Sequence, residues 1–457
     1  MTEVTGVAVI ELGDRTGPAV DDDSGRRGPP ARRPVLLAGV LVLLLVGLTG
    51  GAPLARPLPE AILSARLGTQ VIIADDRLYL ADPITNDPTI VRVPEIAVHA
   101  LPDGRPLGRT RLSVPFDRPT QFLDRVGDIL LFTSWQSNPQ QVAAVRGSTG
   151  ATRWQRIARF EGITAAGDAL LGSPLSPPGS PSEADPLRYG ENLRAVDPVT
   201  GNERWLIEYP PGTVRGARVD RDTGRVSLLA DLLPAGRLRL LDPSTGRVIR
   251  TVDLSARTDP AGSAPPVPVA LRMIDDLVLI DRDDGELVAY EVDRLNRRWS
   301  VPAPIDRASL GDACVTVLCR SGPRGGTDVL DPATGRVLWR SGRWNVYAEH
   351  AGRLVAAADD EGRWDFSPVG ILDPRTGRLL ADLGPWWVMG PVRDGEPVYG
   401  LRFGRDGRAL VAELLPARGS VRVLGGIRDV SGDCRSRDRV LICRRVDGRL
   451  AIWNLAR

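Results

Sequence analysis

Four cysteines are the residues with the most evident chemistry in this chain of 457 residues. They form two close pairs: Cys314 and Cys319 lie in DACVTVLCRSG, and Cys434 and Cys443 lie in GDCRSRDRVLICRR. Each pair ends an apolar, strand-like run, so we expect one disulfide within each pair, between adjacent strands of an exported protein. A zinc site made of all four cysteines is the alternative, although neither pair has the Cys-x-x-Cys spacing of zinc knuckles.

Aspartates recur in a five-residue motif, Asp-Pro-x-Thr-Gly, and could act as catalytic acids or calcium ligands. Pro sets φ for the second position of a type I turn, Asp accepts backbone N–H groups, and Gly adopts the left-handed conformation that closes a bulged hairpin. We therefore interpret these residues as structural turn residues and expect no catalytic or metal-binding residues among them. The four full copies begin at Asp197, Asp242, Asp331 and Asp373 and end at Gly201, Gly246, Gly335 and Gly377.

The turns punctuate a repeat of short strands. Weaker copies occur at residues 147–150, 293–296 and 416–419, with a probable first copy at 82–86. From Gly150 onward the turns follow one another every 40 to 50 residues or so, the period of a four-stranded propeller blade. Alternating apolar runs flank each turn, such as LRLLD before and RVIRTVDL after residues 242–246. The fold class is therefore all-β, a β-propeller of four-stranded antiparallel blades. We expect eight blades, with seven as the alternative.

The last repeat stops after its third strand, in RLAIWNL. Propellers hide their open edges when a strand from one terminus completes the blade begun at the other. We expect the N-terminal segment to supply the strand beside Trp453.

Tryptophans follow several turns at a constant distance. Trp154, Trp205, Trp299 and Trp339 lie three or four residues after a turn, and we predict that they pack between neighbouring blades. Trp386 and Trp387 fall outside this pattern. They are the candidate binding surface, with packing between blades as the alternative.

The pattern of an apolar strand followed by Leu-x-x-Asp-Pro-x-Thr-Gly-x-x-x-Trp resembles the pyrroloquinoline-quinone-like (PQQ-like) propeller repeat over about residues 70–457. The resemblance implies either a quinoprotein dehydrogenase or a non-catalytic relative of the BamB type, here a membrane-anchored protein of actinobacterial type. Active quinoproteins use adjacent cysteines, calcium and an Asp base, and this chain has no adjacent cysteines. We therefore expect no cofactor and no catalysis. A PQQ- or metal-dependent oxidoreductase, or a small-molecule sensor that uses the central funnel, is the alternative.

An apolar run near the N-terminus predicts a membrane anchor. Residues 35–54 are almost long enough to span a bilayer, and Arg26, Arg27, Arg32 and Arg33 precede them. Positive residues favour the cytoplasmic side, so we expect an N-terminus inside and the propeller outside. A cleaved signal peptide is the alternative. The domain prediction is a disordered cytoplasmic tail (1–34), a transmembrane helix (35–54), a linker (55–68) and the propeller (69–457).

These features predict a non-catalytic, extracytoplasmic propeller that serves as a binding platform. The partner would be an unidentified envelope protein or a cell-wall polymer. Nucleic acid is not expected, because 59 basic residues are balanced by 57 acidic ones. The Pro- and Ser-rich insertion at residues 172–192 is a candidate recognition loop, with a flexible excursion that has no binding role as the equal alternative.

Overall fold

The computed structural model describes residues 57–455, except for 75, 82–94, 112–119, 135–139, 176–188, 255–267, 303–309, 312–313, 322–324, 359–366, 391, 393–394 and 405–406. These residues belong to one compact unit, Ala55–Arg457. Within the described ranges the secondary structure is strands and a short 3-10 helix, η3 (Pro416–Arg418). The strands form four-stranded antiparallel sheets, which we call blades.

Blades 1 to 5 follow the chain in order, each with its first strand at one edge and its fourth at the other. Blade 1 is β2 (Gln70–Ala74), β3 (Arg77–Ala81), β4 (Glu95–Ala100) and β5 (Pro106–Arg111); blade 2 is β6 (Thr120–Val126), β7 (Ile129–Ser134), β8 (Gln141–Arg146) and β9 (Thr152–Ile157); blade 3 is β10 (Arg159–Ile163), β11 (Ala169–Pro174), β12 (Glu191–Val196) and β13 (Glu203–Tyr209); blade 4 is β14 (Val214–Val219), β15 (Val226–Leu232), β16 (Arg237–Leu241) and β17 (Val248–Asp253); blade 5 is β18 (Pro268–Ile274), β19 (Leu277–Arg282), β20 (Glu286–Glu291) and β21 (Arg297–Pro302).

Blades 6 to 8 repeat this order, and blade 9 departs from it by taking a strand from the other end of the chain. Blade 6 is β22 (Leu310–Gly311), β23 (Leu318–Ser321), β24 (Thr327–Leu330) and β25 (Val337–Ser341); blade 7 is β26 (Trp344–His350), β27 (Arg353–Ala358), β28 (Pro368–Leu372) and β29 (Leu379–Pro385); blade 8 is β30 (Trp387–Val388), β31 (Val398–Phe403), β32 (Arg408–Leu415) and β33 (Ser420–Arg428); blade 9 is β34 (Val430–Arg437), β35 (Val440–Arg445), β36 (Leu450–Asn454) and β1 (Glu60–Leu63).

The middle strands of each blade are apolar on both faces, because successive side chains point to opposite sides of a strand. In β7, Ile129 and Leu131 pack against blade 3, whereas Leu130 and Phe132 pack against blade 1. A strand that is buried on both faces reads as a continuous apolar run rather than an alternating one. This explains runs such as ILLF and LVLI in the sequence.

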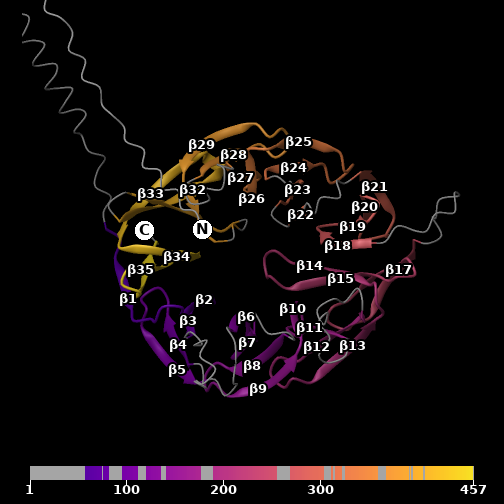
Figure 1. Ribbon diagram of the computed structural model, residues 1–457, viewed down its shortest axis with the longest axis horizontal. Helices are drawn as coiled ribbons and strands as arrows, with labels where there is room; N and C mark the ends of the chain where they lie inside the picture. Colours follow the sequence, from indigo (N-terminus) through magenta and orange to yellow (C-terminus); the bar gives the residue numbers. More distant parts are fainter. Residues whose placement is uncertain are drawn as a thin grey trace, which may run out of the picture. The chain divides into compact units, whose positions relative to one another are not determined.

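The blades form a closed ring. Among the described residues, nine hydrophobic clusters each join two successive blades, and one of them joins blade 9 to blade 1. The first strand of each blade faces the centre of this ring and the fourth strand lies outside (Figure 1). The outer strands are correspondingly exposed, as the pattern of β17 shows.

The ring closes as the incomplete last repeat predicted. β1 pairs antiparallel with β36, with Glu60 opposite Trp453 and Leu63 opposite Leu450. β1 therefore lies inside residues 55–68, which the sequence pattern assigned to a linker, and the propeller begins before Thr69. The boundary was missed because a four-residue strand is too short to show a clear alternation.

The predicted number of blades is wrong: the described residues form nine, not eight or seven. In blades 1 to 8 a hairpin turn joins the third and fourth strands, and in blade 1 this turn surrounds Gly104 and is not a copy of the motif. In blade 9 the third and fourth strands, β36 and β1, come from opposite ends of the chain, so no turn joins them. The expected first copy at residues 82–86 instead belongs to the connection between β3 and β4, and those residues lie outside the described part.

The predicted location is also corrected. In the part of the chain that the structure describes, no helix is long and apolar enough to cross a membrane. The expected helix at residues 35–54, together with the tail at 1–34, lies outside the described residues. The prediction of a single-pass membrane protein is therefore contradicted.

Candidate functional site at the centre of the ring

Bulges in the inner strands shape the centre of the ring. The register between the first and second strands shifts at Leu123, Glu161, Val269, Tyr347 and Ser431, in β6, β10, β18, β26 and β34 respectively. A bulge inserts one unpaired residue and re-aims its side chain. Two of these residues leave apolar surface uncovered, because Val269 is 56% exposed and Tyr347 is 37% exposed. The bulges at Val269 and Tyr347 thus leave apolar side chains exposed on inner strands.

A charged cluster fastens blade 3 to blade 4. Glu161 of β10 and Glu191 of β12 both form ion pairs with Arg215 of β14. Burial alone would lower the pKa of Arg215, but Glu161 and Glu191 raise it above its ordinary value. Gly172 lies against both carboxylates, and a Cβ there would clash with Glu191 Oε1. The two ends of the predicted recognition loop, residues 172–192, therefore meet at this cluster, while 176–188 lie outside the described residues.

Tyr209 extends the cluster toward the middle of blade 4. Its ring lies 5.4 Å from the guanidinium carbon of Arg215 and 5.9 Å from that of Arg239, within the range of cation–π attraction. Arg239 binds both carboxylate oxygens of the buried Asp231, at 2.7 and 2.9 Å. Burial and the nearby Asp231 raise the pKa of Tyr209, which keeps the phenol neutral. With Arg159, which also pairs with Glu161 and Glu191, three arginines balance three carboxylates, so the cluster is a network of ion pairs rather than a set of free acids and bases.

The hairpin between β14 and β15 reaches toward the centre of the ring (Figure 1). Its tip, residues 220–225 (DRDTGR), is an additional Asp-x-x-Thr-Gly turn that reading the repeat did not reveal, since it lies between the first and second strands and lacks Pro. Asp220 accepts hydrogen bonds from the backbone N–H and the hydroxyl of Thr223, both at 2.8 Å, and Gly224 has a φ of +65°. A turn of the same kind as those between the third and fourth strands therefore forms the tip of this inward-facing hairpin.

This central hairpin contacts four other blades. On its β15 side, Arg225 pairs with Asp124 of blade 2 at 3.3 Å. Val226 forms a parallel bridge with Thr164 of blade 3. On its β14 side, Arg221 Nη lies 3.5 Å from a carboxylate oxygen of Asp275 in blade 5. Arg221 also donates to the carbonyl oxygen of Cys314 in blade 6, at 2.9 Å.

Both predicted disulfides are present. Cys434 and Cys443 join β34 to β35, with their Cα atoms 4.0 Å apart. Cys319 lies in β23, but Cys314 lies in the connection before it, so Cys314–Cys319 closes a loop rather than joining two strands. Burial is nearly complete at all four residues, and they pack in two separate clusters, so the zinc alternative has no support.

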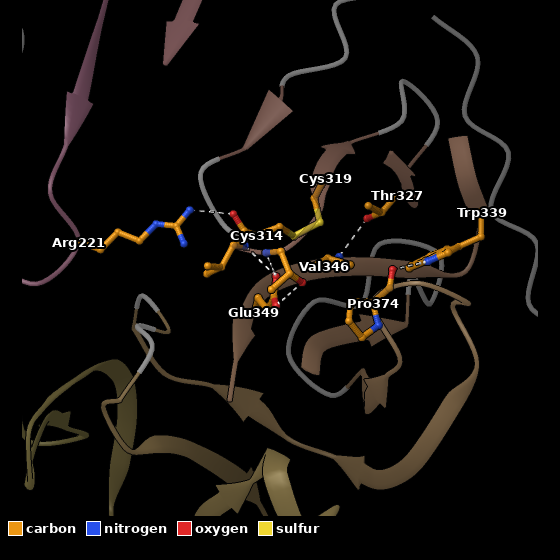
Figure 2. The surroundings of a disulfide bond; sticks show 10 residues. Arg221, Cys314, Cys319, Thr327, Trp339, Val346, Glu349 and Pro374 are labelled. Carbon is orange, nitrogen blue, oxygen red and sulfur yellow. Dashed lines mark hydrogen bonds between the residues drawn. A yellow bond between two sulfur atoms is a disulfide. The ribbon is translucent and has the colours of Figure 1, made fainter. Parts of the chain in front are cut away.

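Glu349 of blade 7 clamps the disulfide loop of blade 6 (Figure 2). This carboxylate is almost fully buried and accepts the backbone N–H groups of Val315 and Thr316, both at 2.7 Å. It also accepts the hydroxyl of Thr316 at 2.6 Å. A buried carboxylate is stable when several donors satisfy it. The loop is therefore held by Glu349 on one side and by Arg221 on the other, which leaves Val315 36% exposed between them.

The predicted turn residues lie where the motif places them, at the hairpin between the third and fourth strands of blades 3, 4, 6 and 7. Asp197 accepts the N–H groups of Val199 and Thr200 at 2.8 and 3.0 Å. Asp373 accepts those of Arg375 and Thr376 at 3.0 and 2.8 Å. The final glycines have positive φ values, from +67° at Gly246 and Gly377 through +71° at Gly335 to +73° at Gly201. Asp242 and Asp331 accept equivalent bonds.

Each repeat tryptophan donates a hydrogen bond to the turn of the next blade. The indole N–H of Trp154 donates to the carbonyl oxygen of Pro198, and Trp205 donates to Pro243, at 2.9 and 3.1 Å. Trp299 and Trp339 do the same with Pro332 and Pro374, at 2.8 and 2.9 Å. A bulge directly before each tryptophan turns the side chain toward the following blade. Blades 1, 4 and 7 have Gly108, Arg250 and Ala381 at the equivalent positions and so lack this contact.

The candidate surface at Trp386 and Trp387 is largely covered. Trp386 is 4% exposed, donates to the carbonyl oxygen of Leu383 at 2.7 Å, and lies under the guanidinium of Arg402. Trp387 packs against the cluster between blades 8 and 9. The structure thus places both rings among packed side chains, the alternative that the sequence left open.

The described residues contain no group of three His, Cys, Asp or Glu side chains that could hold a metal ion. The carboxylates of Glu161, Glu191, Asp231 and Glu349 are instead engaged by arginines, hydroxyls or backbone N–H groups. The arrangement does not fit a quinone with a calcium ion, because these carboxylates already bind arginines, hydroxyls or backbone N–H groups. The central hairpin also reaches toward the centre of the ring. Chemically, the centre offers exposed apolar side chains held on a rigid frame.

Fold and site together define a closed β-propeller with PQQ-like blades. Residues 189–342, which include β12 to β25, match the family model described as outer membrane protein assembly factor BamB. No curated protein matches the sequence.

Three solved structures match this chain over most of its length, at low sequence identity. BamB from Moraxella catarrhalis is 11% identical over 88% of this chain and all of its own, with a TM-score of 0.41. The computationally designed Ika8 protein is 12% identical over 88% of this chain and 98% of its own, with a TM-score of 0.38. The C-terminal WD40 domain of Sif2 is 10% identical over 88% of this chain and 99% of its own, with a TM-score of 0.39. Such distant likenesses carry no argument about function.

Proposed function

We propose that this propeller is a non-catalytic platform that binds another protein and acts in an assembly. The observation that carries the proposal is the match of residues 189–342 to a family described as an assembly factor. That segment includes the central hairpin and the disulfide loop. It therefore covers much of the part of the ring where apolar side chains remain exposed.

The proposed contact surface is the set of exposed apolar residues around the disulfide loop. Val315 lies at the tip of this loop, Tyr347 lies on the neighbouring inner strand β26, and Val219 ends β14 beside the central hairpin. Val219 is 50% exposed. Aromatic and aliphatic side chains on a rigid frame are typical anchors of protein interfaces. Two disulfides are typical of proteins from oxidising compartments, so we expect the partner in the cell envelope.

The test compares matched variants of the full chain as baits for envelope extracts. Val315→Asp and Tyr347→Ala should each reduce the capture of a reproducible partner by about tenfold or more, as loss of an interface anchor does. Ile249→Asp is the control, because Ile249 is 57% exposed on the outer strand β17. Equal capture by all variants would contradict this surface. Retention of a quinone or calcium by the purified chain would instead favour an enzyme or sensor.

A further inference from the structure

The central hairpin is held on two sides, and the two sides contact different kinds of structure. On the β15 side, the fixed points are the Arg225–Asp124 pair and the bridge between Val226 and Thr164, both made to regular strands or turns. On the β14 side, Arg221 makes its hydrogen bond to a carbonyl oxygen of the loop that Cys314–Cys319 closes. The position of this acceptor therefore depends on a covalent bond that a reductant can break.

Blade 6 has little inner strand of its own to hold that loop. β22 is two residues long, and the chain from Cys314 to Cys319 takes its place beside β26 (Figure 2). The disulfide fixes the first residue of the loop, and Glu349 fixes the next two through their N–H groups. The Cys314 carbonyl and the Val315 N–H belong to one planar peptide unit, so the disulfide and Glu349 both help to position the oxygen that Arg221 binds. Without the disulfide, this peptide unit keeps the Glu349 contact but loses its covalent tie to Cys319, and the hydrogen bond from Arg221 is weakened.

We propose that the Cys314–Cys319 disulfide is a redox-sensitive latch that holds the β14–β15 hairpin across the centre of the ring. A dithiol reductant opens the latch: the bond between the two Sγ atoms breaks, each sulfur gains an electron and a proton, and the dithiol becomes a disulfide. The hydrogen bond from Arg221 to Cys314 then weakens, and on its β14 side the hairpin keeps the contacts of Arg221 and Arg218 with Asp275. The inference concerns the chain itself and is independent of the proposed partner.

The disulfide is buried, so its reduction also depends on how easily the surrounding loop opens. Both sulfurs are covered, so a reductant reaches them only when the loop opens, and the Glu349 contacts oppose that opening. Glu349 therefore sets how readily the latch responds. Reduction of the latch should be faster in Glu349→Gln, which keeps the shape of the side chain but weakens its bonds to the loop.

The β14 side of the hairpin provides the readout. Arg218 lies within β14 and pairs with Leu228 of β15, so trypsin cleaves after Arg218 only when this side opens. The full chain is compared with Cys314→Ser/Cys319→Ser and Arg221→Met, with cleavage located by mass spectrometry. We expect cleavage after Arg218 to be about tenfold faster in both variants, and in the native chain after reduction by dithiothreitol. Cys434→Ser/Cys443→Ser is the matched control and should cleave at the native rate.

The pattern across variants decides the proposal. If Arg221→Met accelerates cleavage and the Cys314/Cys319 variant does not, the disulfide is no latch. If neither variant differs from the native chain, the hairpin is held by its other contacts and the proposal is also wrong. Equal acceleration by the Cys434/Cys443 variant would show general loosening of the ring, which contradicts a local device. A Glu349→Gln chain reduced at the native rate would remove the role given to Glu349.

Discussion

At the scale of residues, the glycine that ends each turn is needed for two reasons, its backbone conformation and its close contact with a tryptophan. Gly246 has a positive φ, and a Cβ at this position would lie 2.7 Å from the ring of Trp205 in the preceding blade. Gly201, Gly335 and Gly377 stand in the same relation to Trp154, Trp299 and Trp339. The glycine that ends one turn and the tryptophan that follows the preceding turn therefore form one contact that spans two blades.

Two glycine substitutions separate these requirements. Gly246→Ala should destabilise the protein by about 1–2 kcal/mol through the left-handed backbone and by about 1–3 kcal/mol more through the tryptophan. Gly224→Ala should show the backbone part alone, because φ is +65° there and a Cβ would meet no heavy atom within 4 Å. Urea unfolding followed by tryptophan fluorescence measures both. Equal losses of stability in the two variants would mean that Trp205 can move to accommodate the added methyl group without destabilising the protein.

The turn aspartates should make the stability of the folded protein decrease as the pH falls. The hydroxyl and backbone N–H of Thr376 lower the pKa of Asp373 below its ordinary value, and backbone N–H groups of the turn lower that of Asp197. A carboxyl group with a lowered pKa in the folded state stabilises the protein fully above its unfolded pKa of about 3.9 and loses this contribution as pH falls through the folded value.

The stability difference between the native chain and Asp373→Asn should therefore be constant from neutral pH to about pH 5 and shrink below about pH 4. Urea midpoints measured at several pH values test this. A difference that grows on acidification would show that the carboxylate is not the stabilising form.

At the scale of elements, Arg444 in β35 fastens the segment that follows β1. Its guanidinium donates to the carbonyl oxygens of Arg66, Thr69 and Gly448 at 3.1, 2.8 and 3.0 Å. Main-chain carbonyls satisfied by a buried arginine are left without a donor when it is removed. The closing strand thus depends on a side chain from the other end of the chain.

Arg444→Met should cost about 3 kcal/mol and expose residues 60–66 to hydrogen exchange. Arg449→Met is the control, since Arg449 pairs with the half-exposed Asp447 at the surface and should matter little. Exchange monitored by mass spectrometry distinguishes the two. Unchanged protection of β1 in Arg444→Met would mean that pairing with β36 suffices.

At the scale of the whole molecule, ring closure makes every blade a neighbour of two others. The cluster that contains Leu63, Leu78 and Ile452 joins blade 9 to blade 1 and completes the ring. In an open array the terminal repeats are held on one side only and unfold first. A chain that begins at residue 65 should therefore lose blades 9 and 1 at lower denaturant than the rest. A chain that begins at residue 57 keeps β1 and should unfold in one transition.

Hydrogen exchange along a denaturant series resolves the two chains blade by blade. Uniform loss of protection in the chain that lacks β1 would show that the remaining interfaces keep the ring cooperative without closure.

The repeat was readable because its chemistry is local. Pro, Asp and Gly act within one turn, and alternation acts within one strand, so residues 197–201 identify the hairpin wherever it lies. Both disulfides were predictable for the same reason, since each joins cysteines close in sequence. The central hairpin was missed because residues 220–224 carry the same turn signal, and only pairing with distant strands shows that it faces inward.

The sequence by itself determined that this chain is a propeller of four-stranded blades, which residues form its turns, and that a strand from the N-terminal side completes the last blade. Only the tertiary structure decided that nine blades close the ring, that each repeat tryptophan binds the next blade's turn, and that Arg221, Glu349 and a disulfide meet at the centre. The physical reason is that turn and strand preferences depend on neighbours along the chain. Ring size and central contacts depend on how all the blade interfaces pack together.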